Sequence, residues 1–299
     1  MREEYAQVFS FVEEEKEKII DTVHKIWDYA EEGKKEFRSA AHYVDLLKRE
    51  GLAVREKVAG IETAFMASYG EGSPVIGFLA EYDALAGLSQ KADCTFRSPA
   101  EGRTWGHGCG HNSLGAGALG AFLAVRDFLK ANQMPGTIRL YGCPAEENGG
   151  CKAVMEMAGE FHDLDACFTW HPSDVTFVVT GGTLANIGYL FEFSGISAHA
   201  AANPEDGRSV LDAAELANVG VNYLREHMPD RARIHYAYID AGNPMPNVVQ
   251  DYCAVRYFVR AQSHSHQDST VLAQRQKYRS MEQNRKPRDK STHICLSCI

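Results

Sequence analysis

The sequence lacks a hydrophobic run long enough to cross a membrane. Its longest apolar stretch, Leu114 to Val125, is rich in Gly and Ala and ends at Arg126, well short of the roughly 20 residues that a spanning helix needs. It also lacks a basic and then apolar leader, because residues 1–20 are acidic and amphipathic. The two absences argue against a membrane protein and predict a cytoplasmic one.

The chain has neither an excess of basic residues nor a closely spaced cysteine framework. Its 31 Lys and Arg stand against 40 Asp and Glu, a net charge of −9, which argues against a nucleic-acid partner because phosphate binding needs a clustered basic face. Eight cysteines scattered over 299 residues indicate reduced thiols rather than disulfides. Small-molecule chemistry is the class of function that these absences leave.

The chain is long enough for two domains, and its 44% hydrophobic content predicts a sizeable core. In residues 1–181 strand-like apolar runs alternate with helical patterns, which predicts an α/β domain with a mostly parallel central sheet and helices on both faces. The expected strands are 53–58, 63–69, 75–80, 137–143 and 166–170, and the expected helices are two in the first fifty residues, then 113–130 and 152–158. A loop of about thirty residues precedes residue 113, a length that usually indicates function or disorder.

In residues 182–262 apolar and polar residues alternate in several segments, which predicts a smaller α+β domain. Its expected elements are strands 184–193, 232–240 and 248–260 and a helix at 209–225. The last 37 residues, from Ser263, differ again: they carry seven Lys or Arg against three Asp or Glu and no periodic apolar pattern. We expect residues 263–299 to be a basic, disordered tail outside the fold.

Polar residues follow three of the expected strands. Glu81 and Asp83 come directly after strand 75–80, Glu146 and Glu147 after strand 137–143, and His171 after strand 166–170. Ligands of parallel α/β sheets bind at the carboxyl ends of the strands. Paired carboxylates can simply stabilise a helix start, but three strand ends that each offer a metal-type ligand together predict a metal centre.

A fourth candidate segment opens the helix expected at residue 113. Cys109 and His111 are two residues apart among glycines that would let the backbone approach an ion. Alone this pair is a weak signal, because a buried Cys usually packs as a small hydrophobe. Its weight comes from the strand-end residues that accompany it.

Together these segments resemble the zinc-dependent aminoacylase and carboxypeptidase superfamily, in its amidohydrolase branch, which includes aminobenzoyl-glutamate, hippurate and indoleacetyl-amino-acid hydrolases. Residues 81–85, Glu-Tyr-Asp-Ala-Leu, resemble the branch's Asp-x-Asp-Ala-Leu-Pro segment, with Glu81 where Asp is usual and Ala86 where Pro is usual. Residues 108–112 resemble its Cys-Gly-His segment and residues 144–150 its Pro-Ala-Glu-Glu segment. The implied fold is the phosphorylase/hydrolase-like sheet of that superfamily.

The resemblance implies a site with two divalent metal ions, Zn²⁺ or Mn²⁺. Its ligands would be Cys109, His111, Glu147 and His171. Glu146 would be the general base, taking a proton from a metal-activated water and passing it to the leaving nitrogen, and Asp83 would orient a ligand. The implied reaction is hydrolysis of the amide bond of an N-acyl or peptidyl amino acid, such as an aminobenzoyl-glutamate-like or dipeptide-like substrate.

Residues 195–201 resemble the family's lid segment, which identifies 182–262 as a lid, or dimerisation, domain. In that segment a His, here His199, reaches the active site of the partner subunit in a homodimer. Asn247 and Arg260 resemble the pair that holds the substrate carboxylate.

The resemblance ends after Gln262, where family members continue and supply a further metal-binding His near their C-terminus. We therefore expect a C-terminally truncated family member with an incomplete lid and one weakened metal position. Two other hypotheses stay open. One is an inactive paralogue that binds a ligand or a partner, and the other is a cysteine hydrolase that uses Cys109 as nucleophile with His111 or His107 as base.

Overall fold

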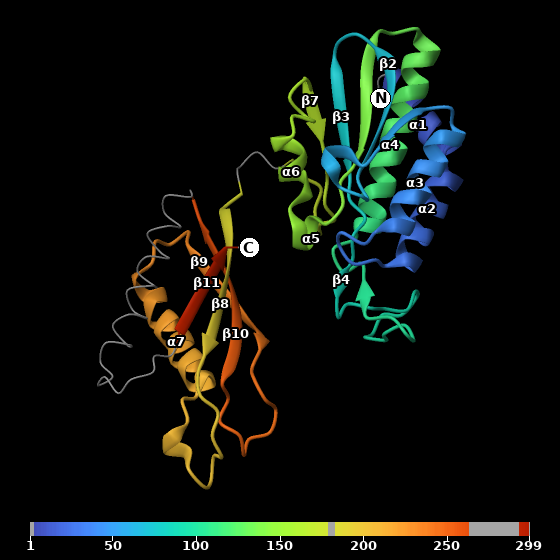
Figure 1. The fold of residues 1–299 in the computed structure, drawn as a ribbon. Coiled ribbons are helices and arrows are strands. Elements are labelled where there is room, and N and C mark those ends of the chain that lie inside the picture. The colour runs from blue at the N-terminus through green and yellow to red at the C-terminus, as the bar shows by residue number, and fades with distance from the viewer. Residues whose placement is uncertain (1–2, 179–182, 263–292, 299) are drawn as a thin grey trace. The chain divides into compact units, whose positions relative to one another are not determined.

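The structure, a computed structural model, describes residues 3–178, 183–262 and 293–298. The chain divides into two compact units, Met1–Thr176 (unit 1) and Phe177–Ile299 (unit 2), which Figure 1 shows with their elements labelled. The domain boundary predicted at residues 181 and 182 lies outside the described residues.

Unit 1 is built on a five-stranded sheet in the order β1-β2-β6-β3-β7. The strands are β1 Ala53–Glu56, β2 Phe65–Glu71, β3 Val75–Ala80, β6 Gly136–Gly142 and β7 Ala166–Phe168. Strands β6, β3 and β7 are parallel, as the alternation of strands and helices predicts. Strand β2 is antiparallel to both of its neighbours, β1 and β6. The short connection between β1 and β2, with the 3₁₀ turn η1 Val58–Gly60, cannot make a parallel crossover.

Helices cover both faces of this sheet, which confirms the predicted α/β class. They are α1 Glu3–Glu14, α2 Lys16–Tyr29, α3 Phe37–Arg49, α4 His111–Asn132, α5 Glu146–Gly149 and α6 Cys151–Met157. Side chains alternate along β6: Ile138 and Leu140 join the core under α2, α3 and α4, whereas Tyr141 joins a second core with Met155 of α6. Three helices, not two, occupy the first fifty residues, because the first is interrupted at Glu15.

The segment expected to be a loop before residue 113 contains a small antiparallel sheet that the sequence did not predict. Its strands are β4 Leu85–Ala86 and β5 Trp105–Gly106. Gly106 lies so close to this segment that an added Cβ would be 2.0 Å from the Leu88 carbonyl oxygen. The small sheet returns the chain from the end of β3 to the start of α4, which places residues 81–83 beside His111.

Unit 2 has a four-stranded antiparallel sheet in the order β11-β8-β10-β9. The strands are β8 Ala185–Ser194, β9 Arg233–Asp240, β10 Tyr252–Ala261 and β11 His293–Cys298. Helix α7 (Val210–Leu224) begins at Ser209, whose Oγ accepts a hydrogen bond from the Asp212 amide at 3.1 Å. Its buried face packs on Phe191 of β8 and on other core residues of the sheet. Short 3₁₀ turns, η2 Pro204–Asp206 and η3 Arg225–His227, lie on either side of α7.

Two parts of unit 2 differ from the sequence-based expectation. His293–Cys298, expected to lie outside the fold, pairs with β8 as strand β11, because the open edge of β8 offers backbone groups that any extended segment can satisfy. The rest of the expected tail, residues 263–292 and 299, lies outside the described residues. Strand β10 begins only at Tyr252, since Val249 instead donates its amide to the Ala198 carbonyl at 3.0 Å.

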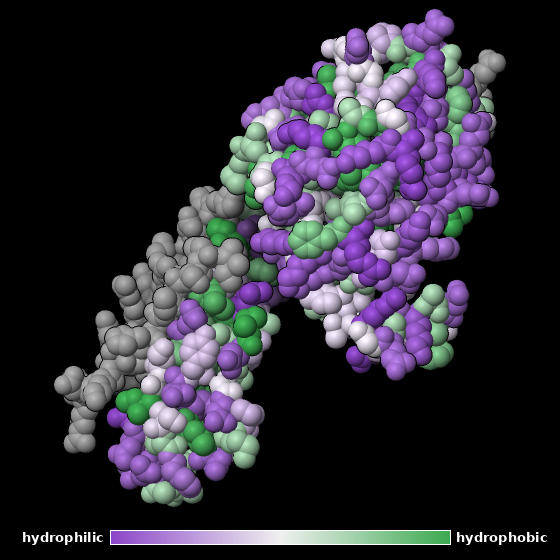
Figure 2. All heavy atoms as spheres, turned by 45° about the vertical axis from the view of Figure 1, so that its right-hand side comes forward, coloured by the Kyte–Doolittle hydropathy of each residue, from purple (hydrophilic) through white to green (hydrophobic). Residues whose placement is uncertain are grey.

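The face of unit 1 that Figure 2 presents is mostly polar. Figure 2 shows charged and polar residues over most of its visible face, with apolar side chains in scattered patches. Within the described residues, no helix combines the length and the apolar character that a membrane crossing requires.

Candidate metal centre

The predicted strand-end residues converge at one edge of the unit 1 sheet. Glu81 directly follows β3, Glu146 begins the short helix α5 after β6, and His171 follows β7. His111 is the first residue of α4, whose start adjoins the same edge. The parallel order β6-β3-β7 brings these segments together (Figure 1), as expected for the carboxyl ends of neighbouring parallel strands.

Asp83 fixes the orientation of His111. The Nδ1 atom of this buried imidazole lies 2.8 Å from Oδ1 of Asp83 and 3.1 Å from the Asp83 carbonyl oxygen. Both partners are acceptors, so Nδ1 carries the proton and the lone pair of neutral His111 is on Nε2. Burial alone would lower the pKa of His111, but the hydrogen bond to Asp83 and the neighbouring carboxylates raise it.

Glu81 lies between two imidazoles and is fully buried. Its Oε2 atom is 3.1 Å from Nε2 of His111 and 3.1 Å from Nε2 of His171. Yet neither Oε2 nor the Nε2 atom of His111 has a hydrogen-bond partner among the described residues. Buried polar atoms rarely stay unsatisfied, so two that face one another indicate a place for a further group.

The atoms around this point fit a divalent metal ion. There are two overlapping sets of residues, and within each set the ligand atoms all lie within 4.8 Å of one another: Cys109, His111 and His171 in one, and Glu81, His111, Glu146 and His171 in the other. Imidazole nitrogen, carboxylate oxygen and thiolate sulfur are the donors that zinc takes in proteins. The two imidazoles belong to both sets, so the geometry brings together the predicted ligands Cys109, His111 and His171.

Glu146 and Glu147 are equally far from His111, because each has a carboxylate oxygen 3.9 Å from its Nε2 atom. Only Glu146 also belongs to the four-residue set, although the resemblance gives the ligand role to Glu147 and the base role to Glu146.

Two carboxylates from other segments hold the loop that presents this pair. Ala145 has a left-handed conformation (φ 52°), which is strained for a residue with a Cβ. Its amide donates to Oε1 of buried Glu36 at 2.7 Å, and the Glu147 amide donates to Oδ2 of Asp83 at 3.0 Å. Both bonds fix the position of residues 145–147.

The acidic surroundings also set the protonation of two candidate groups. Burial raises the pKa of Glu146, and the charge of Glu81 adds to this effect. Burial, followed by the charge of Glu147, raises the pKa of the Cys109 thiol to about 11. Without a bound cation, Cys109 is therefore a protonated thiol at neutral pH.

Sequence reasoning left two residues of this candidate centre without a role. Glu81 was among the strand-end candidates, but neither a ligand nor a catalytic role was assigned to it. Lys152 of α6 was not singled out at all, and its Nζ donates to Oε1 of Glu81. Burial lowers the pKa of Lys152, but Glu81 outweighs this effect, so the pKa is raised overall.

The lid candidates lie in unit 2, and the structure brings only two of them together. His199 forms a bridge with Val248, and the Ala200 amide donates to the Asn247 carbonyl at 3.0 Å. Arg260 is near the far end of β10 (Tyr252–Ala261), and an extended strand places it about 26 Å from Tyr252. The length of β10 therefore separates Arg260 from Tyr252, the end of the strand that follows Asn247 along the chain.

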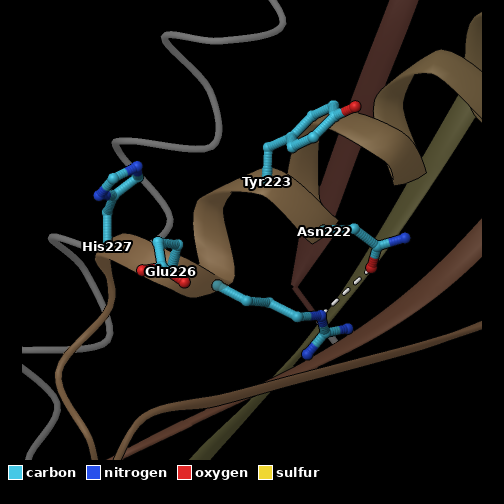
Figure 3. A pocket seen from close by; sticks show the side chains of 5 residues that line it. Asn222, Tyr223, Glu226 and His227 are labelled. Carbon is cyan, nitrogen blue, oxygen red and sulfur yellow. Dashed lines mark hydrogen bonds between the residues drawn. The ribbon is translucent and has the colours of Figure 1, made fainter.

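A separate hollow lies at the end of α7, where its lining residues include Asn222, Tyr223, Glu226 and His227. The Nε atom of Arg225 donates to the Asn222 side-chain oxygen at 3.2 Å, a bond drawn as a dashed line in Figure 3. None of the predicted site residues lines this hollow.

Comparisons with known proteins identify the family and the fold. A family model described as "Peptidase family M20/M25/M40" matches residues 77–281. The match therefore continues past Gln262, where the resemblance was expected to end.

Among solved structures, an aminobenzoyl-glutamate utilization protein from Klebsiella pneumoniae superimposes with a TM-score of 0.65 at 20% identity, covering 98% of this chain and 77% of its own. A dinuclear metal-binding peptidase of the M20 family from Bacillus subtilis gives a TM-score of 0.62 at 17% identity, covering 97% and 74%. These structures share the fold.

Curated relatives are more similar in sequence. A p-aminobenzoyl-glutamate hydrolase chain of Escherichia coli is 45% identical over 264 residues, which are 87% of this chain and 54% of the relative. The Xaa-Arg dipeptidase of Mus musculus is 30% identical over 84% of this chain and 57% of its own length. The chain spans about half the length of these relatives. From the family match over residues 77–281, the chain belongs to peptidase family M20/M25/M40.

Proposed function

We propose that this protein is a metal-dependent hydrolase that cuts the amide bond of N-acyl or peptidyl amino acids. The observation that carries the proposal is a pair of buried atoms without a hydrogen-bond partner, Oε2 of Glu81 and Nε2 of His111, which face one another at 3.1 Å beside Nε2 of His171. In a family of peptidases, such a convergence of ligand atoms is best explained by a catalytic metal ion.

The ligand roles follow from the two overlapping sets of atoms. His111 and His171 belong to both; Cys109 completes one set, and the carboxylates of Glu81 and Glu146 complete the other. Glu147 belongs to neither set, but one of its carboxylate oxygens is 3.9 Å from Nε2 of His111, and its side chain lies beside the Cys109 thiol. The resemblance to the aminoacylase and carboxypeptidase superfamily implies two metal ions, Zn²⁺ or Mn²⁺, with Glu147 as one of the ligands. A divalent ion here would supply Lewis acidity toward water and toward the scissile carbonyl.

Glu146 is the general base in this proposal. Its pKa is raised by burial and by the charge of Glu81, which makes it a better proton acceptor than an exposed Glu. It takes a proton from the attacking water and then delivers that proton to the leaving nitrogen. The water oxygen forms the new bond to the carbonyl carbon, and the C–N bond breaks.

Substrate choice rests on the named relatives and on the lid. The relatives are named for p-aminobenzoyl-glutamate and for Xaa-Arg dipeptides, both of which carry an amide bond next to a free carboxylate.

The Nδ1 atom of His199 lies 3.2 Å from the amides of Ala201 and Ala202, which donate to it. Its proton is therefore on Nε2, where it can be donated to a substrate carbonyl oxygen. Asn247 beside His199, and Arg260 separately, are the proposed contacts to the substrate.

A homodimer through unit 2 would bring the lid of one subunit to the site of another. Helix α7 exposes Leu216, Val219 and Tyr223 on one face, with 52%, 47% and 72% of each residue's surface accessible. An apolar stripe of this spacing on an exposed helix face is typical of an interface. Leu216→Glu should shift the sedimentation coefficient toward that of a monomer, whereas Glu205→Gln in the exposed turn η2 should leave it unchanged.

The alternative cysteine hydrolase is less well supported. A pKa of about 11 for Cys109 keeps the thiol protonated at neutral pH, and a nucleophilic cysteine needs a thiolate. The inactive-paralogue hypothesis makes a different prediction: metal binding without turnover of any acyl or peptidyl amino acid.

The test joins metal analysis to turnover. The purified chain is analysed for bound metal and assayed on p-aminobenzoyl-glutamate, hippurate and Xaa-Arg dipeptides, with added Zn²⁺ or Mn²⁺ and with a chelator. We expect bound metal and chelator-sensitive hydrolysis. His111→Asn should lose the metal, and Glu146→Gln should lose turnover while retaining it. Chelator-resistant turnover would support the cysteine hydrolase, and bound metal without turnover would support the inactive paralogue.

A further inference from the structure

The carboxylate of Glu81 is divided between two unlike neighbours. Its Oε1 atom accepts a hydrogen bond from Nζ of Lys152, and its Oε2 atom faces the imidazoles of His111 and His171 at 3.1 Å each. Lys152 belongs to α6 and is 71 positions further along the chain. Glu81 is fully buried, so the carboxylate end of this contact lies inside the protein, while the lysine side chain reaches it from a partly exposed position.

The contact also matters for charge. Glu81, Asp83, Glu146 and Glu147 bring four carboxylates to one edge of the sheet, and such a group repels itself unless cations are nearby. The ammonium of Lys152 interacts favourably with both Glu81 and Glu146. Its side chain is 29% exposed, so this charge is only partly screened by water.

We propose that Lys152 is a positioning residue of the metal centre, which holds Oε1 of Glu81 and thereby presents Oε2 alone as a ligand atom. The inference rests on the proposed function, because it requires a divalent ion at the cluster. Carboxylates can bind a metal through one or both oxygens. With Oε1 occupied by the ammonium, Glu81 is restricted to one-oxygen coordination in the space between the two imidazoles.

The choice of lysine has a physical reason. An ammonium is a compact charge that can occupy a single carboxylate oxygen, whereas a guanidinium presents a planar fork that matches both oxygens at once. Arginine at position 152 would keep the charge but compete for Oε2. Lys152→Arg therefore separates the positioning role from a purely electrostatic one.

The experiment measures the affinity of the full chain for Zn²⁺ against a chromophoric chelator. The variants are Glu81→Gln, Lys152→Met, the double variant and Lys152→Arg, with Lys35→Met as a control that removes an exposed ion pair with Glu32. We expect each of the first two changes to weaken Zn²⁺ binding by about ten-fold or more. In the Glu81→Gln background, Lys152→Met should cause no further loss, because the lysine acts through that carboxylate. Lys152→Arg should also bind Zn²⁺ more weakly than the parent.

Several outcomes would overturn the inference. Additive losses in the double variant would mean that Lys152 acts independently of Glu81, and parent-like affinity of Lys152→Arg would leave only a charge effect. Unfolding midpoints of the metal-free variants identify any that fail to fold, in which case Lys152→Gln takes the place of Lys152→Met.

The parent chain distinguishes this inference from the proposed function. A parent that binds Zn²⁺ and loses it with His111→Asn, but not with Glu81→Gln, contradicts the inference alone. A parent that binds neither Zn²⁺ nor Mn²⁺ contradicts both.

Discussion

The carboxylate of Asp83 joins two parts of the metal centre, because one oxygen lies 2.8 Å from Nδ1 of His111 and the other accepts the Glu147 amide at 3.0 Å. The first contact fixes the imidazole so that Nε2 faces the cluster. The second holds the loop that carries the two glutamates. Asp83 thus controls the position of the proposed ligand His111 and of the loop that carries Glu146 and Glu147.

Asp83→Asn should weaken metal binding although the side chain keeps its shape. An amide has one oxygen and one NH₂ group, so whichever way it is turned, one of the two donors loses its acceptor. Loss of such an orienting partner typically weakens metal binding by about 10- to 100-fold. Zn²⁺ competition titration measures the change. Asp163→Asn, which alters an exposed carboxylate paired with Arg139, should bind like the parent, and equal affinities of the two variants would contradict the prediction.

Glu36→Gln should destabilise unit 1 through the same loop. The buried carboxylate accepts the Ala145 amide at 2.7 Å and the Thr63 hydroxyl at 3.0 Å. A glutamine there keeps the Ala145 amide only through its carbonyl oxygen, and its NH₂ group then faces the Thr63 hydroxyl, which has to turn from donor to acceptor. Replacing two hydrogen bonds to a carboxylate by neutral ones costs about 1–2 kcal/mol, which urea unfolding of the metal-free chain can measure.

Glu32→Gln is the matched control for Glu36→Gln, since it removes only a partly exposed ion pair with Lys35. Its free energy of unfolding should stay close to that of the parent. Equal values for the two glutamine variants would mean that Glu36 does not hold the loop.

The positions of the candidate ligands could be predicted from the sequence because a simple rule governs them. The carboxyl ends of parallel strands share an edge, so Glu146 after β6 and His171 after β7 had to approach each other once the α/β class was recognised. The contact between Lys152 and Glu81 could not be predicted, because it depends on where α6 lies after a turn. The pairing of β11 with β8 was also hidden, since an edge strand accepts backbone rather than a particular sequence.

The lid shows a different limit of sequence reasoning. A resemblance suggested that Asn247 and Arg260 act together, yet residues 252–260 form one extended strand that separates them. Each residue of an extended strand adds about 3.3 Å of length. Two residues that are only a few positions apart in a motif can therefore lie far apart in space.

Gly115→Ala should destabilise unit 1 even though alanine favours helices. Gly115 lies on α4, and a Cβ there would be 2.4 Å from the Glu81 carbonyl oxygen and 2.5 Å from the Tyr43 hydroxyl. The backbone atom cannot move without displacing the end of β3. We expect a loss of about 1–3 kcal/mol from overpacking, which exceeds the gain of about 1 kcal/mol in helix propensity. Thermal and urea unfolding measure the net effect.

Gly120→Ala on the same helix is the control for Gly115→Ala. Its Cβ would meet only the end of the Ile19 side chain, at 2.6 Å from Cδ1, and a flexible side chain can shift. The loss should therefore be clearly smaller than for Gly115→Ala. A larger loss at Gly120 would show that the approach of α4 to residue 81 is not the tight contact.

His42 should make the metal-free chain less stable as the pH falls below neutrality. Its imidazole is buried on α3, with Nε2 3.0 Å from the Thr22 hydroxyl oxygen. That hydroxyl donates its own hydrogen to the Lys18 carbonyl at 2.8 Å, so Nε2 must be the donor to Thr22. Burial lowers the pKa of His42. The charged side chains that also affect it are Lys25, Asp21, Arg49 and Asp45.

The sign of the effect follows from proton binding. In the unfolded chain His42 takes up a proton as the pH falls through about 6.5, whereas in the folded chain its lowered pKa delays this uptake. The unfolded state then binds more protons, so the free energy of unfolding decreases as the pH falls through this window, down to the folded-state pKa.

His42→Gln keeps a donor but does not titrate, so its stability should fall less between pH 7.5 and 5.5. His24→Gln, at an exposed site on α2, should retain the parent's slope. Because chelator is present throughout, proton competition with metal does not contribute, and equal slopes for both variants would mean that His42 is not the titrating group.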